Sequence, residues 1–300
     1  MPSIKHWVSA ARLRTLPLSI SGIILATSFA AYNGYVNWYI FVLALLTTVA
    51  LQVLSNFAND YGDGVKGTDN DERVGPKRAL QSGNVSADQM FMAIKINILV
   101  IIALVVTLLF CAFGMRHFLY TMLFLALGAL SVYAAINYTV GDSAYGYKGL
   151  GDVFVFIFFG LVSGLGTYFL YTLKIDHVII LPAFTIGLLS VAVLNLNNMR
   201  DIISDEKSNK ITLAVKLGFE NAKRYHYILI CGAILLSAIF AVLYYVSPYN
   251  LMFMVMYIPL VKHLFYVRKT TNPSLLDSEL KKVAISTFLL AILMGVGYII

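Results

Sequence analysis

Long runs of apolar residues alternate with short polar segments along this chain. Each run has about 17 to 24 residues, which is enough for an α-helix to cross a hydrocarbon layer of about 30 Å. The strands of a membrane barrel would alternate polar and apolar residues, and these runs do not. The pattern therefore predicts an all-α polytopic membrane protein, a bundle of nine transmembrane helices. We expect the spans at about residues 16–32, 38–58, 91–113, 118–138, 152–172, 178–199, 225–246, 249–267 and 283–300.

The distribution of positive charge predicts the orientation of the bundle. Only 12% of the 300 residues are charged, whereas soluble domains carry roughly 25%. With the N-terminus inside, all but two of the 22 Lys and Arg residues (Arg116 and Lys174) fall on the cytoplasmic side. This bias predicts a cytoplasmic N-terminus and an external C-terminus. The net charge of +7 then reflects topology and attraction to lipid head groups, and not nucleic-acid binding.

Acidic and amide residues gather in two clusters, each at the predicted cytoplasmic end of a span. The first lies in "NFANDYGDGVKGTDND" (56–71), where Asn59 and Asp63 are four residues apart. The second lies in "NLNNMRDIISDEKSNK" (195–210) and contains Asn197, Asp201 and Asp205 at successive steps of four. Because each step of four drifts by only about 40° around a helix, these side chains project from one side.

The repeated Asn-x-x-x-Asp spacing predicts a single domain, residues 1–300, made of two related halves. The halves cover about 1–140 and 141–300, and the spacing recurs 138 residues further along the chain. We expect the long polar loops, at about 59–90, 139–151, 200–224 and 268–282, all on the cytoplasmic side. Function should therefore reside at that face.

Two facing stripes of oxygen donors favour a hard divalent cation. Mg²⁺ is usually held by one or two carboxylates together with substrate phosphates. Basic residues that suit phosphate contact stand beside both clusters, namely Arg73, Lys77, Arg78, Arg200, Lys207 and Lys210. An isolated Asp at a span end is usually a solvated cap. Two matched stripes on one side of the membrane instead favour a functional site.

These motifs resemble those of the UbiA superfamily of intramembrane prenyltransferases. That superfamily carries Asn-x-x-x-Asp-x-x-x-Asp and Asp-x-x-x-Asp motifs. Here the second is complete, whereas the first has Gly67 at its third position, with Asp69 and Asp71 close behind. The stretches "NDYGDGVKG" and "GLGDVFVFIFFG" are more specific and resemble the branch that prenylates dihydroxynaphthoate in menaquinone synthesis.

The resemblance implies an activity and its partners. It implies Mg²⁺-dependent transfer of a polyprenyl chain from polyprenyl diphosphate to 1,4-dihydroxy-2-naphthoate. Diphosphate and CO₂ are released, and the product is demethylmenaquinol. The protein is then expected to lie in the bacterial cytoplasmic (inner) membrane, surrounded by membrane lipids.

The resemblance also implies roles for individual residues. We expect a metal site made of Asn59, Asp60, Asp63, Asn197, Asp201 and Asp205. The residues expected to take part in catalysis are Asp63, Asp201, Asp205, Tyr147 and Lys148. Those expected to bind the diphosphate are Lys66, Arg78, Lys210 and Arg14, although a topology anchor is as good an interpretation of Arg14. Lys262, Lys281 and Lys282 are interpreted as anchors at the membrane surface.

Other functions stay open on the residues alone. The metal motifs do not separate dihydroxynaphthoate from other ring acceptors, such as 4-hydroxybenzoate, haem or a homogentisate-type ring. A secondary transporter would place its carboxylates near the membrane midplane, in broken helices, and not at the rim. A phosphatidyl-alcohol transferase would need Ala-Arg after Asp-x-x-Asp-Gly, and that pair is missing after Asp60 and Asp63.

Overall fold

The computed structural model describes residues 2–69 and 74–300, and all regular elements in these two ranges are helical. The expected nine spans are confirmed by length and composition within this part of the chain. Six of them are built on the long helices α2 (Leu16–Tyr32), α3 (Trp38–Val65), α4 (Ala87–Phe113), α5 (Phe118–Asn137), α8 (His177–Arg200) and α11 (Phe219–Leu243).

The first span also includes the short helices that precede α2, and each of the other three combines more than one helical segment. The fifth consists of α6 (Gly151–Val155), the π-helix η3 (Phe156–Gly166) and α7 (Thr167–Thr172). The eighth joins η4 (Pro248–Met256) to α12 (Tyr257–Lys269), and the ninth joins η5 (Pro273–Leu276) to α13 (Asp277–Ile299).

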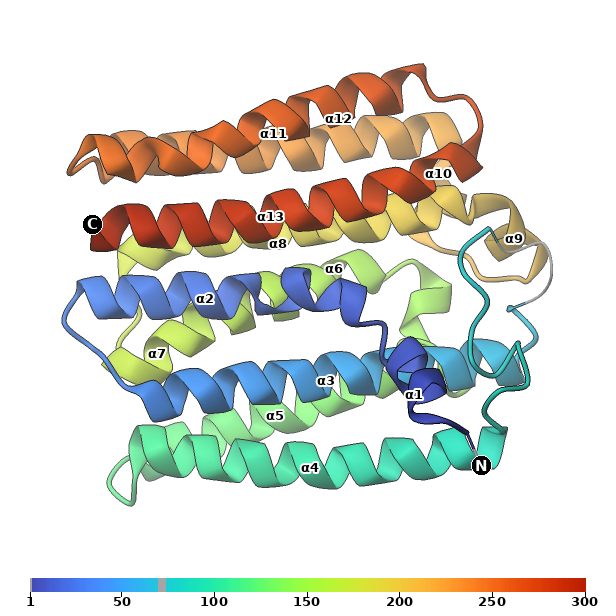
Figure 1. Ribbon diagram of the computed structural model, residues 1–300, viewed down its shortest axis with the longest axis horizontal. Helices are drawn as coiled ribbons and strands as arrows, with labels where there is room; N and C mark the ends of the chain where they lie inside the picture. The colour runs from blue at the N-terminus through green and yellow to red at the C-terminus, as the bar shows by residue number, and fades with distance from the viewer. Residues whose placement is uncertain (1, 70–73) are drawn as a thin grey trace.

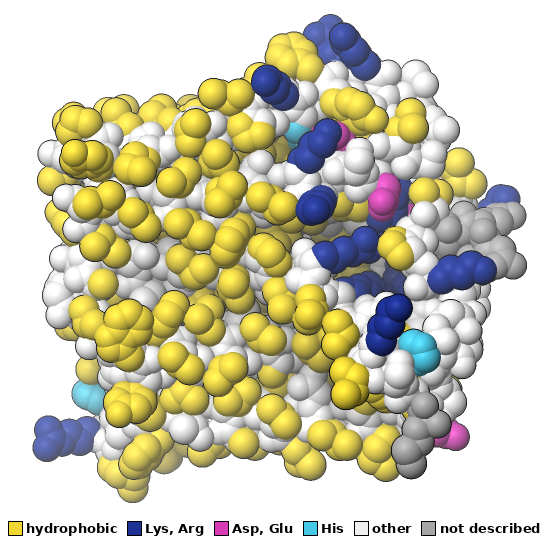
Figure 2. All heavy atoms as spheres, viewed as in Figure 1, with side chains coloured by type: hydrophobic (Ala, Val, Ile, Leu, Met, Phe, Trp, Pro, Cys, Tyr) yellow, Lys and Arg dark blue, Asp and Glu magenta, His cyan; other side chains and the backbone are white. Residues whose placement is uncertain are grey.

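The long helices run side by side, and three of the short helices lie at one end of the bundle (Figure 1). That end holds α1 (Ile4–Ala11), α9 (Ile202–Lys207) and α10 (Leu213–Leu217). The N-terminus lies at this end and the C-terminus at the other, as an odd number of spans requires. Basic side chains cluster at the same end, beside a wide apolar surface (Figure 2). Which end faces the cytoplasm stays a prediction.

Two of the expected loops are more helical than the sequence pattern indicated. The loop expected from residue 59 starts later, because α3 continues to Val65 and carries Asn59 and Asp63 in its last two turns. The loop expected at 200–224 contains α9, α10 and the start of α11. In both places the helical path continues past the apolar run, and it carries buried acids there, Asp63 on α3 and Asp205 on α9.

Small residues bring the backbones at the centre of the bundle into contact. Helix α8 packs against η3, α11 and α13. A Cβ placed on Gly160 would lie only 2.7 Å from the Cα of Gly187, and one on Gly164 would lie 2.7 Å from the Cβ of Ala183. Membrane helices associate through such close approaches, since lipid offers no hydrophobic gain for burying larger side chains.

The division into two related halves stays a prediction. Helix α2 belongs to the first half in sequence but packs closely against α13. Its Leu25, Ala26 and Phe29 share a hydrophobic core with α8, α11 and α13. The α3 and α4 helices form a separate core with α1. The second-half core therefore includes a helix of the first, which fits one domain.

We predict that Gly160→Ala lowers the melting temperature of the protein in detergent by several degrees. The added methyl meets backbone atoms of α8, and overpacking of this kind costs about 1 to 3 kcal/mol. The matched control is Gly232→Ala, whose Cβ would lie 3.4 Å from the Cδ1 of Leu188, an ordinary contact. Equal melting temperatures for the two variants would show that the α8–η3 contact is not tight.

Candidate functional site

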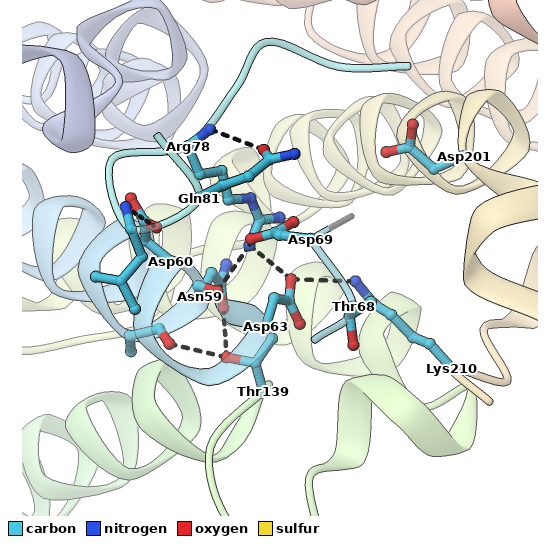
Figure 3. A network of polar contacts seen from close by, with 12 residues as sticks. Asn59, Asp60, Asp63, Thr68, Asp69, Arg78, Gln81, Thr139, Asp201 and Lys210 are labelled. Carbon is cyan, nitrogen blue, oxygen red and sulfur yellow. Dashed lines mark hydrogen bonds and ion pairs between the residues drawn. The ribbon is translucent and has the colours of Figure 1, made fainter. Parts of the chain in front are cut away.

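Asp63 is the central acid of the site and is fully buried. Its carboxylate accepts hydrogen bonds from Arg78 Nη1 at 2.6 Å and from the Tyr147 hydroxyl at 2.7 Å. The Nζ of Lys210 lies 3.4 Å from the same carboxylate (Figure 3). Buried carboxylates need such partners, because an uncompensated charge in the interior is very costly. Three segments far apart in the sequence thus meet at one side chain of α3.

Arg78 neutralises the first acid cluster. Besides Asp63, its Nη1 contacts the Asp69 carboxylate at 3.0 Å and donates to the carbonyl of Asn59 at 2.7 Å. Burial alone would lower the pKa of Arg78, but the charges of Asp63 and Asp69 raise it above its usual value. The guanidinium therefore stays charged. Asn59 is oriented in turn by Thr139, whose hydroxyl lies 3.2 Å from the Asn59 side-chain oxygen.

Asp60 holds the chain that follows the first cluster. Its two carboxylate oxygens accept hydrogen bonds from the backbone amides of Ala79 and Leu80, at 3.0 and 3.2 Å. These bonds anchor the segment that carries Arg78 onto α3. A metal-binding role for Asp60 stays a prediction, and its contacts favour a structural role.

Arg200 organises the second cluster at the end of α8. Its Nε and Nη2 donate to the two oxygens of Asp201, at 2.9 and 2.5 Å, and Nη2 also donates to the Asn197 side chain at 2.9 Å. Its Nη1 donates to Asp277, in the first turn of α13, at 2.7 Å. The amide of Asp205 donates to the carbonyl of Asp201, so the chain keeps a helical path into α9.

Lys210 joins the two clusters. Besides its contact with Asp63, its Nζ lies 3.8 Å from the carboxylate of Asp205. The side chain is buried, and Figure 3 shows it reaching toward Asp63 from the segment after α9. Acids that stand about 140 residues apart in the sequence therefore share one cation at the same end of the bundle.

Residues of both clusters line one cavity of about 700 Å³, although Asp60, Asp201 and Asp205 are not among its lining residues. Its polar mouth includes Asn59, Asp63, Arg78, Asn197, Arg200 and Lys210. Its deeper wall is apolar and includes Leu108, Leu109, Phe124, Phe158, Phe159 and Leu170. A molecule with an anionic head and a long apolar tail would match both parts of this cavity.

The remaining predicted residues differ in how near they lie to the cavity. Arg14 lines it. The Tyr147 hydroxyl donates a hydrogen bond to Asp63 and shares another with the Thr68 hydroxyl. Burial together with the charge of Asp63 raises the pKa of Tyr147, so its hydroxyl stays protonated. The Nζ of Lys66 donates to the carbonyl of Gly141 and lies 4.3 Å from the centre of the Tyr147 ring. Burial lowers the pKa of Lys66.

Lys148 and the third position of the first motif both lie apart from the contacts around Asp63. The Lys148 side chain is exposed and is not among the residues that line the cavity, so its catalytic role stays a prediction. At the third position of the first motif, Gly67 has a positive φ of 71°, and Asp69 reaches Arg78 instead. Asp71 and Arg73 lie outside the described residues.

Sequence reasoning missed two residues of the last span. Asp277 and Lys281, both on α13, line the cavity. In the sequence Lys281 has the pattern of a membrane-surface anchor, and Asp277 belongs to no motif. A lone acid at a helix start is common, because it favours the positive end of the helix dipole. Only the fold brings α13 to the mouth.

The donor set at the mouth suits Mg²⁺. In the described part of the chain, no three His, Cys, Asp or Glu side chains already converge as a metal cage. The carboxylates of Asp63 and Asp201 are instead paired with Arg78 and Arg200. Mg²⁺ needs few protein ligands when substrate phosphates supply the others, and all the oxygen donors here are hard amide or carboxylate oxygens. The residues present therefore fit a magnesium–diphosphate complex.

Comparisons with known proteins agree on one family. Residues 20–296 match the UbiA prenyltransferase family. The chain is 42% identical to the 1,4-dihydroxy-2-naphthoate octaprenyltransferase of Haemophilus influenzae, across 99% of this chain and 96% of the relative. It is 40% identical to the enzyme of that name from Escherichia coli, across 97% and 94%.

Solved structures share the fold at low sequence identity. A UbiA homolog from Archaeoglobus fulgidus bound to DMAPP and Mg²⁺ superposes with a TM-score of 0.61 at 14% identity, covering 95% of this chain and 99% of that one. Another structure of a homolog from the same organism gives a TM-score of 0.66 at 13% identity, covering 98% and 100%. These likenesses establish the arrangement of the helices.

The contacts of Asp60 predict a structural effect of Asp60→Asn. The new amide nitrogen would face a backbone N–H, so one of the two bonds to Ala79 and Leu80 is lost. We expect faster limited proteolysis within residues 74–86. The Mg²⁺ concentration that gives half-maximal activity should stay within about threefold of that of the unmodified protein. Asp88→Asn, at an exposed acid of α4, serves as the control. Unchanged proteolysis with a strongly raised Mg²⁺ requirement would instead identify Asp60 as a metal ligand.

Proposed function

The chain belongs to the UbiA prenyltransferase family, and from that premise we propose that it is a 1,4-dihydroxy-2-naphthoate polyprenyltransferase. It transfers a polyprenyl chain from polyprenyl diphosphate to the naphthoate, releasing diphosphate and CO₂ and giving demethylmenaquinol. One observation carries the proposal: a single cavity has residues of both clusters at its polar part, Asn59 and Asp63 from the first and Asn197 and Arg200 from the second, and apolar side chains along the rest of its wall.

The donor substrate fits the two parts of the cavity. Its diphosphate lies at the mouth, within reach of Lys210, Arg78 and Arg14, which all line the cavity. Its polyprenyl tail follows the apolar wall formed by α4, α5 and η3. Arginine suits bidentate contact with phosphate oxygens, and lysine supplies a mobile charge. The buried position of Arg78 and Lys210 strengthens these contacts, because water screens them little.

Mg²⁺ would be held by Asn59, Asp63, Asn197, Asp201 and Asp205 together with the diphosphate. When bound, it supplies positive charge that stabilises the departing diphosphate. Tyr147 keeps the Asp63 carboxylate in place through its hydroxyl, and Thr139 does the same for the Asn59 side chain. These neighbours keep the oxygen donors oriented toward the mouth.

The cationic side chains assist the breaking of the allylic C–O bond, whose electrons leave with the diphosphate. The electron-rich naphthoate ring attacks the allylic carbon, and a carbon–carbon bond forms. The carboxyl group leaves as CO₂, and the electrons of its bond to the ring restore aromaticity. The apolar wall excludes water, which would otherwise capture the allylic cation.

The protein acts as an integral membrane protein of the bacterial inner membrane, with the mouth of the cavity on the cytoplasmic side. The nine apolar spans support the membrane location. The bias of basic residues toward the polar end supports the orientation (Figure 2). The charged groups of both substrates would then reach the mouth from the aqueous phase on the cytoplasmic side.

We predict that the purified protein converts polyprenyl diphosphate and 1,4-dihydroxy-2-naphthoate into a prenylated product in the presence of Mg²⁺. Mass spectrometry should show the mass of naphthoate plus prenyl chain minus CO₂. Chelation of Mg²⁺ with EDTA should abolish product formation, and added Mg²⁺ should restore it. Turnover of 4-hydroxybenzoate in preference to the naphthoate would contradict the proposed acceptor while keeping the family reaction.

We predict that Asp201→Asn lowers turnover by roughly 100-fold or more, because the site loses a charged oxygen donor for Mg²⁺. The fold should survive, since Arg200 keeps Asp277 as its partner. A melting temperature close to that of the unmodified protein would show that the variant is folded. Glu206→Gln changes an exposed acid one residue from Asp205 and should leave turnover unchanged. Near wild-type turnover of Asp201→Asn would remove Asp201 from the metal site.

A further inference from the structure

Arg200 is shared between two carboxylates that come from different helices. Its side chain is almost fully buried, with an exposed fraction of 1%. Nε and Nη2 bind Asp201, while Nη1 binds Asp277 at 2.7 Å. Asp277 is 46% exposed and lines the cavity from α13, outside both acid motifs. One guanidinium thus connects the second motif to the last span.

This arrangement creates a conflict when a divalent cation binds. The oxygens of Asp201 that Arg200 occupies are the same oxygens that Mg²⁺ would use. Arginine does not lose its charge in proteins, so the guanidinium and a metal on the same carboxylate would repel each other, which favours movement of the guanidinium away from the metal. A buried charge that loses its only partner is strongly destabilising. Arg200 therefore needs a second carboxylate within reach.

We propose that Asp277 is a positioning residue that holds the Arg200 guanidinium when Mg²⁺ takes the Asp201 carboxylate. The inference rests on the proposed function, in which Asn197 and Asp201 help to bind the metal. The Nη1 bond to Asp277 already exists, so Nε and Nη2 have to release Asp201, and Nη2 also has to release the Asn197 side chain. A small rotation of the guanidinium about this bond frees the metal ligand without leaving a buried charge unpaired.

The first cluster has the same arrangement of charges. Arg78 lies between Asp63, at 2.6 Å, and Asp69, at 3.0 Å, just as Arg200 lies between Asp201 and Asp277. In each cluster an arginine therefore pairs with one carboxylate of the motif and with a second carboxylate outside it, Asp69 for Arg78 and Asp277 for Arg200. Asp69 follows the first motif so closely that it could itself bind metal. Asp277 offers the clearer test, because it belongs to neither motif.

A purely structural role for Asp277 predicts different behaviour. An acid in the first turn of α13 stabilises that helix through its dipole, whichever residue stands at position 200. Such a role would change the melting temperature but not the affinity for metal. Metal binding and its dependence on Arg200 therefore distinguish positioning from helix stabilisation.

The test measures Mn²⁺ binding to the purified full-length protein in detergent, by electron paramagnetic resonance, without substrate. Asp277→Asn should weaken Mn²⁺ binding roughly tenfold, because Arg200 then stays on Asp201. Asp277→Glu should restore binding to within about threefold, since it returns the carboxylate. Glu220→Gln is the matched control: Glu220 is an exposed acid paired with Lys223 and lies away from the cavity. The melting temperature of each variant, measured without metal, shows whether the variant is folded.

A double-mutant cycle with Arg200→Gln completes the test. In the Arg200→Gln background, Asp277→Asn should not change Mn²⁺ binding further, because no guanidinium remains for Asp277 to hold. Unchanged binding in the single variant, or the same loss in both backgrounds, would overturn the proposal. The second result would mean that Asp277 attracts the metal itself. Product formation by the wild-type protein tests the proposed function separately, so the two can fail independently.

Discussion

The site depends on mutual neutralisation of buried charges at one end of a membrane bundle. Asp63 and Asp201 are both buried, and each has an arginine at hydrogen-bond distance. Lys210 then connects the two clusters through Asp63 and Asp205. Carboxylates packed this closely would repel one another without those cations. In the proposed function, a metal on these carboxylates would leave Arg78 and Lys210 available to a diphosphate, so the charges that stabilise the free site would also prepare it for substrate.

The apolar helices form the wall of the cavity that leads away from this charged mouth. Glycines of η3 and α8 let the backbones touch, and they fix the wall along which an apolar tail can lie. The π-helical turns of η3 occur in the same wall, and such turns are often found at functional sites. Because the cavity continues from the charged mouth into this wall, one site can hold both ends of an amphipathic donor.

The sequence predicted the features that follow from local periodicity. Nine apolar runs predicted nine spans, and the four-residue spacing placed Asn197, Asp201 and Asp205 along one helical path, which the hydrogen bonds into α9 preserve. Contacts between distant segments were not predictable in this way. Asp277 lacks a motif, and Lys281 resembles any basic anchor, yet α13 brings both to the cavity. The two hydrogen bonds from the backbone amides of Ala79 and Leu80 to Asp60 likewise depend on how the loop after α3 folds back onto that helix.

An experimental structure with Mg²⁺ and a polyprenyl thiodiphosphate, which resists cleavage, tests the central claim most directly. The diphosphate should lie between Asp63 of α3 and Asp201 at the end of α8, with oxygen donors from both clusters around the metal and the tail along the wall of η3. A diphosphate that contacts only one cluster, or binds in a different cavity, would contradict the account.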